Sequence, residues 1–201
     1  MVIADVCDKG LGAALFMTLF RSFIRRVSNI DFYACTSSGY GNSSGDRILQ
    51  AISLTNKYII ETHGDTGMFA TIFFGIFDSH TGLLTYLNGG HLPPRLINKH
   101  GVKNILTLTG PAIGGRLDAD FALREVMMEP GDTFFAFTDG LTDAENIAGE
   151  TFSEKALILV FGVDQTLLSI LAQIQKKLDN FTVGTQQIDD ITMLAVKRCK
   201  K

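Results

Sequence analysis

The sequence has few cysteines, and no two of them are close together. Cys7, Cys35 and Cys199 are widely spaced and form no Cys-x-x-Cys pair. A disulfide framework and a thiolate zinc site both need closely spaced cysteines, so the pattern argues against both. Free cysteines fit a reducing compartment best, and we expect a cytoplasmic protein.

The sequence also lacks a strong excess of positive charge and a long apolar run. The net charge is −3 and the pI is about 5.8, so nothing recommends nucleic acid as the partner. The most apolar run, Met68–Phe77, is about half of the roughly 20 residues that span a bilayer, so we predict no membrane span. The N-terminus has no basic region followed by a small-residue cleavage site, which argues against a signal peptide.

What is present is a chain of domain size with enough apolar residues for a packed core. Its 201 residues and hydrophobic fraction of 46% predict one ordered domain, residues 1–201. No fixed-period repeat or linker-like stretch divides the chain. The first residues, Met1–Ala4, look like the end of a strand with no lead-in, so we expect the domain to be truncated at its N-terminal edge.

The spacing of apolar residues predicts two helices early in the chain, two helices late in the chain, short strands between the two pairs and one strand after them. Helical spacing covers Leu11–Val27 and Asp46–Glu61, separated by the polar stretch Thr36–Gly45, and later Ser153–Phe161 and Asp164–Leu178, which open on an N-capping Ser or Asp. Period-two or apolar runs predict strands at Phe69–Asp78, Leu83–Asn88, Pro94–Asn98, Val102–Leu106, Phe121–Met128, Asp132–Thr138 and Ile191–Val196. Because tight turns join neighbouring strands, the fold class is α+β, with helices packed on antiparallel sheets.

Three stretches place an aspartate at the end or the start of an apolar strand. Asp5 follows Val2–Ala4, Asp139 follows Phe135–Thr138, and Asp189 precedes the last strand. In an antiparallel sheet the end of one strand lies beside the start of its neighbour, so these three residues can meet at one rim. The ordinary alternative is that all three are turn and cap residues.

Three carboxylates at one place repel one another unless a cation lies between them. Oxygen ligands without a Cys or His cluster favour Mg²⁺ or Mn²⁺. Two such ions about 3.5–4 Å apart make a water nucleophilic near neutral pH, which is the chemistry of phosphoester hydrolysis.

Four motifs along the chain together resemble a known family. They are Asp5–Gly10 with the following Ala13–Met17, Asn88–Pro94, Phe137–Asp143 and Asp189–Thr192. In this order they resemble the metal-dependent serine phosphatases of the type 2C (PPM) superfamily. The most similar branch is the bacterial one that regulates sigma factors, the sporulation stage II and stress-response phosphatases.

The resemblance implies a fold and a set of metal ligands. The fold would be an αββα sandwich, two antiparallel sheets flanked by helix pairs, with two Mn²⁺ or Mg²⁺ ions at one end. Asp5 falls on the family's bridging aspartate, and Val6 would supply a backbone carbonyl ligand. Asp139 and Asp189 fall on the aspartates that hold the second metal, and we expect Asp190 to orient its neighbour.

Other residues near these motifs have competing interpretations. Asp143 can bind a third, weaker ion or cap a helix, and Asp8 can affect the centre electrostatically or be a solvated turn residue. His91 can serve a metal centre, although in the family it resembles a structural turn residue. Relatives begin with further strands that carry a Gly-Gly-Asp motif, which this chain lacks. The exposed sheet edge expected from this favours pairing with another chain, such as a homodimer partner.

The leading hypothesis is a protein serine/threonine phosphatase that uses metal-activated water and forms no phosphoenzyme. The resemblance implies a phosphorylated anti-sigma-factor antagonist, a small STAS-type domain, as the substrate. The rival is a non-catalytic phosphatase-fold interaction or signalling module, which the absent front strands favour. A two-metal nuclease is weaker, because no basic groove is evident.

Overall fold

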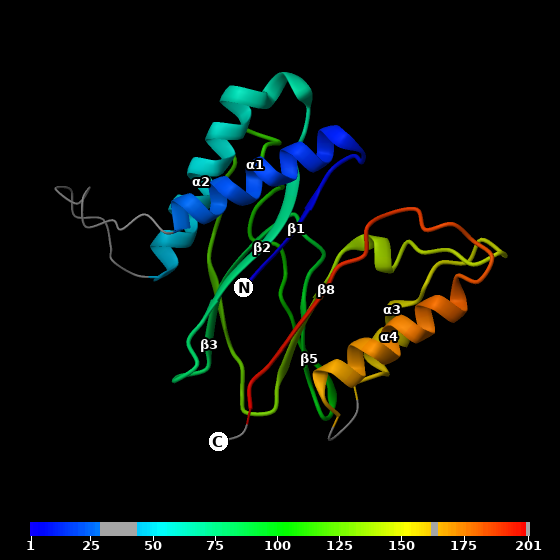
Figure 1. The fold of residues 1–201 in the computed structure, drawn as a ribbon. Helices are drawn as coiled ribbons and strands as arrows, with labels where there is room; N and C mark the ends of the chain where they lie inside the picture. Colours follow the sequence, from blue (N-terminus) through cyan, green and yellow to red (C-terminus); the bar gives the residue numbers. More distant parts are fainter. Residues whose placement is uncertain (29–43, 162–164, 200–201) are drawn as a thin grey trace. The chain divides into compact units, whose positions relative to one another are not determined.

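The structure is a computed structural model that describes residues 1–28, 44–161 and 165–199. Its contacts divide the chain into two compact units, whose elements are drawn in Figure 1. Unit 1 consists of Met1–Asp78, Leu83–His91 and Leu108–Val126, and unit 2 of Ser79–Gly82, Leu92–Thr107 and Met127–Lys201. Each unit combines helices with antiparallel strand pairs, and each is described by itself below.

Unit 1 is built on a four-stranded sheet of order β1-β2-β3-β6. Its strands are β1 (Val2–Val6), β2 (Ala70–Phe77), β3 (Leu83–Gly89) and β6 (Arg124–Met127), and its helices are α1 (Leu11–Ser28), α2 (Ser44–His63) and the 3-10 helix η2 (Gly64–Thr66). The β1–β2 and β2–β3 pairs are antiparallel. The two long helices contact each other, α1 contacts β1, and α2 contacts β2 and β3 (Figure 1). In this order β1 is an edge strand.

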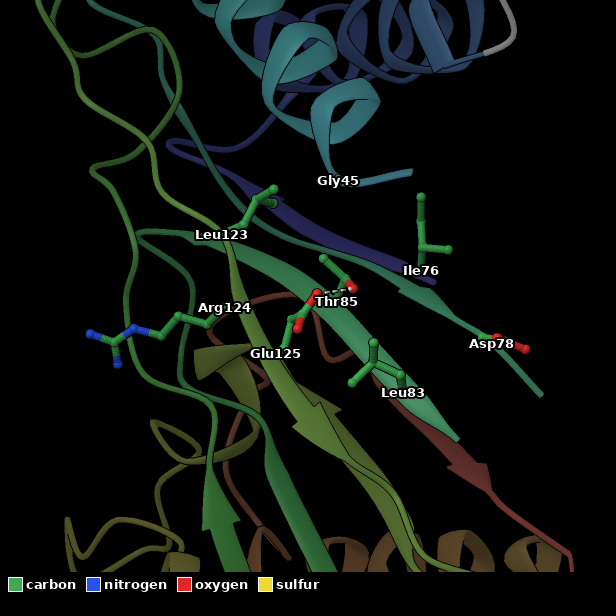
Figure 2. A pocket seen from close by; sticks show the side chains of 8 residues that line it. All are labelled: Gly45, Ile76, Asp78, Leu83, Thr85, Leu123, Arg124 and Glu125. Carbon is green, nitrogen blue, oxygen red and sulfur yellow. Dashed lines mark hydrogen bonds between the residues drawn. The ribbon is translucent and has the colours of Figure 1, made fainter. Parts of the chain in front are cut away.

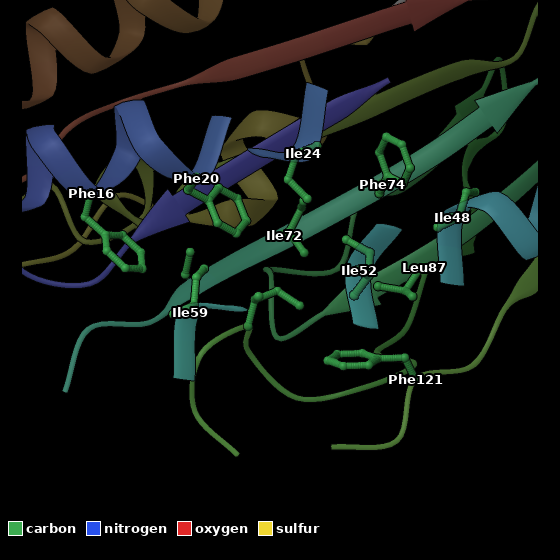
Figure 3. Close-up of a cluster of buried hydrophobic side chains, with 12 residues drawn as sticks. Phe16, Phe20, Ile24, Ile48, Ile52, Ile59, Ile72, Phe74, Leu87 and Phe121 are labelled. Atoms are coloured by element: carbon green, nitrogen blue, oxygen red, sulfur yellow. The ribbon is translucent and has the colours of Figure 1, made fainter. Parts of the chain in front are cut away.

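The core of unit 1 forms where the apolar stripes of the two helices meet one face of the sheet. Figure 3 shows this cluster, in which α1 and α2 supply residues four or seven positions apart, the spacing of one helix face. The fully or nearly buried members include Phe16, Phe20, Ile24, Ile48, Ile52, Ile59, Ile72, Phe74, Leu87 and Phe121. Burying a side chain of this size contributes about 1.5–3 kcal/mol to stability, so this face fixes the helices on the sheet.

Unit 2 repeats the plan with a different order of elements. Its sheet has the order β5-β4-β7-β8. The strands are β4 (Arg95–Asn98), β5 (Gly101–Ile105), β7 (Thr133–Phe137) and β8 (Met193–Lys197), and the helices are α3 (Glu154–Ile158), α4 (Leu167–Phe181) and the 3-10 helix η3 (Asp139–Leu141). Every residue of β7 is buried. Phe135 and Phe137 of β7 pack in one cluster with Ile170, Ile174 and Leu178 of α4.

The predicted α+β class with two antiparallel sheets and flanking helices is confirmed. Within the described residues, no helix is long and apolar enough to cross a membrane. Helix α4 begins at Leu167, and the hydroxyl of Thr166 caps it by accepting a hydrogen bond from the Ser169 amide at 3.2 Å. The predicted start, Asp164, lies outside the described residues, as does most of the predicted loop Thr36–Gly45.

Two sequence-based boundaries are wrong. Of the strand predicted over Phe121–Met128, only the part that forms β6 is observed. The first residues leave the strand because Phe121 is buried in the unit 1 core and the Ala122 amide donates to the Thr109 carbonyl. The helix predicted from Ser153 is the short α3, and the Ser153 side chain makes no capping hydrogen bond.

A buried carboxylate holds the turn before β7 and gives a testable stability contribution. Asp132, whose side chain is 4% exposed, accepts from the Glu129 amide and from Lys103 Nζ, both at 2.8 Å. The hydrogen bond between Lys103 and Asp132 is the main cause of a raised pKa of Lys103. We expect Lys103→Met to lower the free energy of unfolding by about 2 kcal/mol, because it removes a charged partner from a buried carboxylate.

The contribution of Lys103 should depend on pH in a defined direction. A lysine whose pKa is raised by folding stabilises the fold fully below its unfolded pKa of about 10.4 and loses this effect as the pH rises through the folded value. Urea titrations at pH 8 and pH 11 measure it. The difference in unfolding free energy between wild type and Lys103→Met should be smaller at pH 11 than at pH 8. A larger difference at pH 11 would contradict a stabilising role of the Lys103 charge.

Candidate metal centre

The strand β7 delivers Asp139 to the surface at the point where the buried strand ends. Thr138 is still buried, with 3% of its surface exposed. Asp139 then opens the 3-10 turn η3 and is exposed. Its carboxylate forms no hydrogen bond or ion pair within the described part of unit 2. An exposed carboxylate without a cationic partner is available to a metal ion.

Thr138 ties this turn to the segment that carries Asp189 and Asp190. The Thr138 amide donates to the Thr192 carbonyl at 3.1 Å. The Thr138 hydroxyl donates to the Asp190 carbonyl at 3.0 Å and accepts from the Thr192 amide at 2.9 Å. Three hydrogen bonds therefore hold the chain around Asp139 against the chain around Asp189, although about fifty positions separate them in the sequence.

Gly140 is needed because the neighbouring backbone leaves no space for a side chain at this position. A Cβ at this position would overlap the carbonyl oxygen of Asp190 and lie 3.0 Å from the carbonyl carbon of Asp190 and 3.3 Å from that of Asp189. Its φ lies outside the left-handed region, so the backbone conformation does not explain the glycine. Only a residue without a side chain lets the two acidic segments touch.

The other predicted acidic residues of unit 2 are joined to one another or to the Asp139 turn through backbone amides. Asp189 Oδ1 accepts from the Asp190 amide at 2.8 Å, which fixes one of its oxygens. The Asp143 amide donates to the Asp139 carbonyl at 2.8 Å, so Asp143 follows within one turn, and its side chain is exposed. Unit 2 thus brings Asp139, Asp189 and Asp190 together along the backbone, with Asp143 close by.

Unit 1 holds the remaining predicted residues near the end of β1. Asp5 is half-buried and pairs with Thr71 of β2. Val6 is the last residue of β1, and the following Cys7 is hydrogen-bonded to the backbone of Phe69, the residue before β2. Asp8 has a positive φ of 69° and accepts from the Lys9 amide, as expected for a turn aspartate.

His91 is part of the framework around Asp5. It is 2% exposed, its amide donates to Asn88 Oδ1 at 2.9 Å, and its Nδ1 lies 3.0 Å from the Thr71 hydroxyl. Thr71 in turn reaches the Asp5 carbonyl at 3.5 Å. Burial and these contacts agree with the structural interpretation of His91.

The two halves of the predicted site therefore lie in different units. Within neither unit do the described residues gather three or more His, Cys, Asp or Glu side chains into a group that could hold a metal ion. Sequence reasoning missed Thr138, whose hydroxyl joins the two acidic segments of unit 2. The available signal was a threonine directly before the strand-end aspartate.

A pocket at the far end of the unit 1 sheet involves none of these residues. It has a volume of about 620 Å³ and is lined by the end of β2, the start of β3 and residues of and beside β6. Figure 2 shows its polar side chains, among them Glu125, which accepts a hydrogen bond from Thr85 at 3.3 Å. Since Asp5 pairs with the start of β2, this pocket is not part of the candidate metal centre.

Comparison with known proteins identifies the family. The model of the family described as "Stage II sporulation protein E (SpoIIE)" matches residues 1–199. The chain belongs to the SpoIIE family. The resemblance to sporulation stage II phosphatases seen in the motifs is thereby confirmed.

Two relatives align along nearly the whole chain. Protein IcfG of Synechocystis sp. (strain ATCC 27184 / PCC 6803 / Kazusa) is 40% identical over 98% of this chain and 33% of its own length. Phosphoserine phosphatase RsbU of Bacillus subtilis (strain 168) is 25% identical over 98% of this chain and 55% of its own length. The chain thus spans about a third to about half of the length of these relatives.

Solved structures show the same fold at low sequence identity. The SiaA-PP2C domain of Pseudomonas aeruginosa matches with a TM-score of 0.72 and 22% identity over 98% of this chain and 74% of that chain. The catalytic domain of the serine/threonine protein phosphatase PstP, described in complex with two manganese ions, matches with a TM-score of 0.68 and 14% identity over 96% of this chain and 85% of that chain. The SpoIIE-family chain therefore has the fold of PP2C-type phosphatases.

Proposed function

We propose that this SpoIIE-family chain is a protein phosphatase that hydrolyses phosphoserine or phosphothreonine with two divalent metal ions. The observation that carries the proposal is the contact between the Asp139 turn and the Asp189–Asp190 segment in unit 2. Family membership and the relative named as a phosphoserine phosphatase support it. The rival hypothesis, a non-catalytic module, does not explain why the two acidic segments are in contact at Gly140.

The donor set in unit 2 fits a hard divalent cation. The Thr138 hydrogen bonds hold the segments that carry Asp139 and Asp189 against each other, and neither carboxylate has a cationic partner among the described residues of unit 2. Carboxylate oxygens without thiolates favour Mg²⁺ or Mn²⁺. We propose Asp139 and Asp189 as ligands of one ion, with Asp5 and the Val6 carbonyl of unit 1 completing a two-ion centre and Asp143 as a weaker, secondary contact.

The chain's own residues have separate tasks in this proposal. Bound Mn²⁺ or Mg²⁺ supplies a water that is nucleophilic near neutral pH and neutralises charge on the phosphate. Thr138 and Gly140 keep the two acidic segments of unit 2 in contact, and Asp190 orients Asp189 through its amide. The pairing of Asp5 with Thr71 fixes its place on β1.

The proposed substrate is a phosphorylated protein of the STAS type that antagonises an anti-sigma factor. The resemblance to the sigma-factor-regulating branch and the likeness to RsbU support this choice. The net charge of −3 makes a nucleic acid substrate unattractive because phosphate backbones need basic surfaces.

Phosphate release under metal control tests the proposed function. We expect release from a phosphoserine peptide to need added Mn²⁺ and to fall to background with excess EDTA, since the chelator removes the ions. A phosphorylated STAS-type domain should be a better substrate, by kcat/KM, than a peptide with the same phosphorylation site. Calorimetry that detects no Mn²⁺ binding at millimolar concentration would instead support the non-catalytic module.

A further inference from the structure

A tight turn in unit 2 presents an apolar side chain to solvent. The Gly149 amide donates to the Asn146 carbonyl at 2.9 Å, and the Asn146 side chain accepts hydrogen bonds from the amides of Ala148 and Glu150. Asparagine and glycine are usual turn residues. Isoleucine is not, yet Ile147 lies inside this turn and is 81% exposed. The hydrogen bonds of the turn therefore hold an apolar side chain where solvent reaches it.

A second turn of unit 2 lies beside the first and adds another exposed apolar side chain (Figure 1). The Thr185 hydroxyl donates to the Glu145 carbonyl at 2.8 Å. A Cβ on Gly184 would lie 3.2 Å from Cγ2 of Ile147, so the two turns are in contact. Val183, directly before Gly184, is 68% exposed. We call the surface formed by Ile147 and Val183 the apolar ridge, because exposed apolar side chains that gather in one place mark interaction sites.

Both turns continue into the acidic segments of the candidate metal centre. Ile147 follows Asp143 by four positions, so at most about 14 Å of chain separates them. On the other side, Gln187 Nε2 donates to the Asp189 carbonyl at 2.8 Å, and Ile188 between them is 53% exposed. A protein segment that carries a phosphoserine at these aspartates therefore has its neighbouring residues within reach of the ridge.

The surroundings of the ridge are acidic, which decides between possible occupants. Asp143, Glu145 and Glu150 are exposed, and none of them forms an ion pair in the described part of unit 2. A second copy of the chain would set these carboxylates against their own equivalents, and like charges in contact disfavour association. An anionic membrane surface is disfavoured for the same reason. A partner segment with aliphatic and basic side chains complements both the ridge and its charge.

We propose that the apolar ridge docks the protein substrate, through an aliphatic side chain about four residues from the phosphoserine and a basic side chain next to it. This proposal rests on the proposed phosphatase function and adds what the enzyme requires around the phosphorylated residue. The aliphatic side chain covers Ile147 and Val183, and the basic side chain pairs with Glu145 or Glu150. The ridge contacts neither the ions nor the phosphate, so it sets specificity.

Hydrolysis of matched phosphopeptides by the full chain with Mn²⁺ tests this proposal. The probe is acetyl-Lys-Leu-Gly-Ser-Gly-pSer-Gly-Ser-Gly-Leu-Lys-amide, in which either chain direction places a leucine beside the ridge. Two comparison peptides replace both leucines by serine or both lysines by glutamine. We expect kcat/KM of the probe to exceed that of the serine peptide at least tenfold and that of the glutamine peptide severalfold. Equal values for the three peptides would overturn the proposal.

Variants of the chain assign each preference to its own residues. Ile147→Ser with Val183→Ser should remove the preference for leucine, and Glu145→Gln with Glu150→Gln should remove the preference for lysine only. Leu168→Ser, at a side chain of α4 that is also 81% exposed, should change neither. A preference that survives in its own variant would contradict the proposal. So would sedimentation that shows a dimer lost in the Ile147→Ser variant, since the occupant would then be a second copy.

Hydrolysis of p-nitrophenyl phosphate separates this proposal from the proposed function. This small substrate has no side chains that could dock, so its Mn²⁺-dependent hydrolysis should be equal in the wild type and in all the variants of the ridge. If the wild type does not hydrolyse it, the phosphatase function and the docking proposal both fail. If the wild type hydrolyses it but does not distinguish the peptides, only the docking proposal fails.

Discussion

Asp139→Asn is expected to lower Mn²⁺-dependent hydrolysis of a phosphoserine peptide about a thousandfold, because a bound ion contributes several kcal/mol to charge stabilisation. Asparagine keeps the size of the side chain but removes the negative charge that holds the cation. The Asp139 side chain makes no hydrogen bond or ion pair within the described part of unit 2, so the fold should tolerate the change. Initial rates at saturating Mn²⁺ measure the effect.

The matched control for this change is Asp179→Asn. Asp179 lies in the same unit, on the exposed side of α4, where it accepts a hydrogen bond from Gln175. The activity and Mn²⁺ affinity of Asp179→Asn should equal those of the wild type. The thermal unfolding midpoints of Asp139→Asn and Asp179→Asn should both lie within a few degrees of the wild-type midpoint. If Asp139→Asn retained wild-type activity, Asp139 would be a turn residue only.

Gly140→Ala is expected to weaken Mn²⁺ binding at least tenfold, without removing any ligand. The added methyl group would overlap the Asp190 carbonyl oxygen, so the Asp139 turn and the Asp189–Asp190 segment must move apart. Three hydrogen bonds of Thr138 resist this movement. Since overpacking commonly costs about 1–3 kcal/mol, we also expect a lower unfolding free energy. Calorimetric titration with Mn²⁺ and urea unfolding measure the two effects.

Gly12→Ala serves as the control for a glycine-to-alanine change. Gly12 lies in α1, and a Cβ there would meet nothing within 4 Å. Alanine favours the helix by about 0.5–1 kcal/mol, so stability should rise slightly and Mn²⁺ affinity should not change. Equal Mn²⁺ affinity in Gly140→Ala and the wild type would mean that contact between the acidic segments is not needed for binding.

Most elements of the fold follow from local patterns in the sequence. The helical spacing of Phe16, Phe20 and Ile24 predicts α1, because one face of the helix must be buried. The run Thr133–Phe137 predicts β7, whose residues are all buried. These signals are local, so a single sequence carries them.

Other features depend on contacts between distant segments, which no local pattern contains. The reason for Gly140 is the backbone of Asp190, about fifty positions away. The shortened β6 results from Phe121, which joins the unit 1 core and leaves the strand. The aspartates themselves were predictable from their places at strand ends, whereas the hydrogen bonds by which Thr138 joins their segments depend on the register of β7 and β8.

Anomalous diffraction at the manganese edge, from crystals grown with Mn²⁺, is the decisive measurement for the proposed two-ion centre. We expect two peaks about 3.5–4 Å apart, with Asp139 and Asp189 within bonding distance of one and Asp5 within bonding distance of both. Peaks at other residues, or Asp5 far from any ion that Asp139 and Asp189 bind, would contradict it.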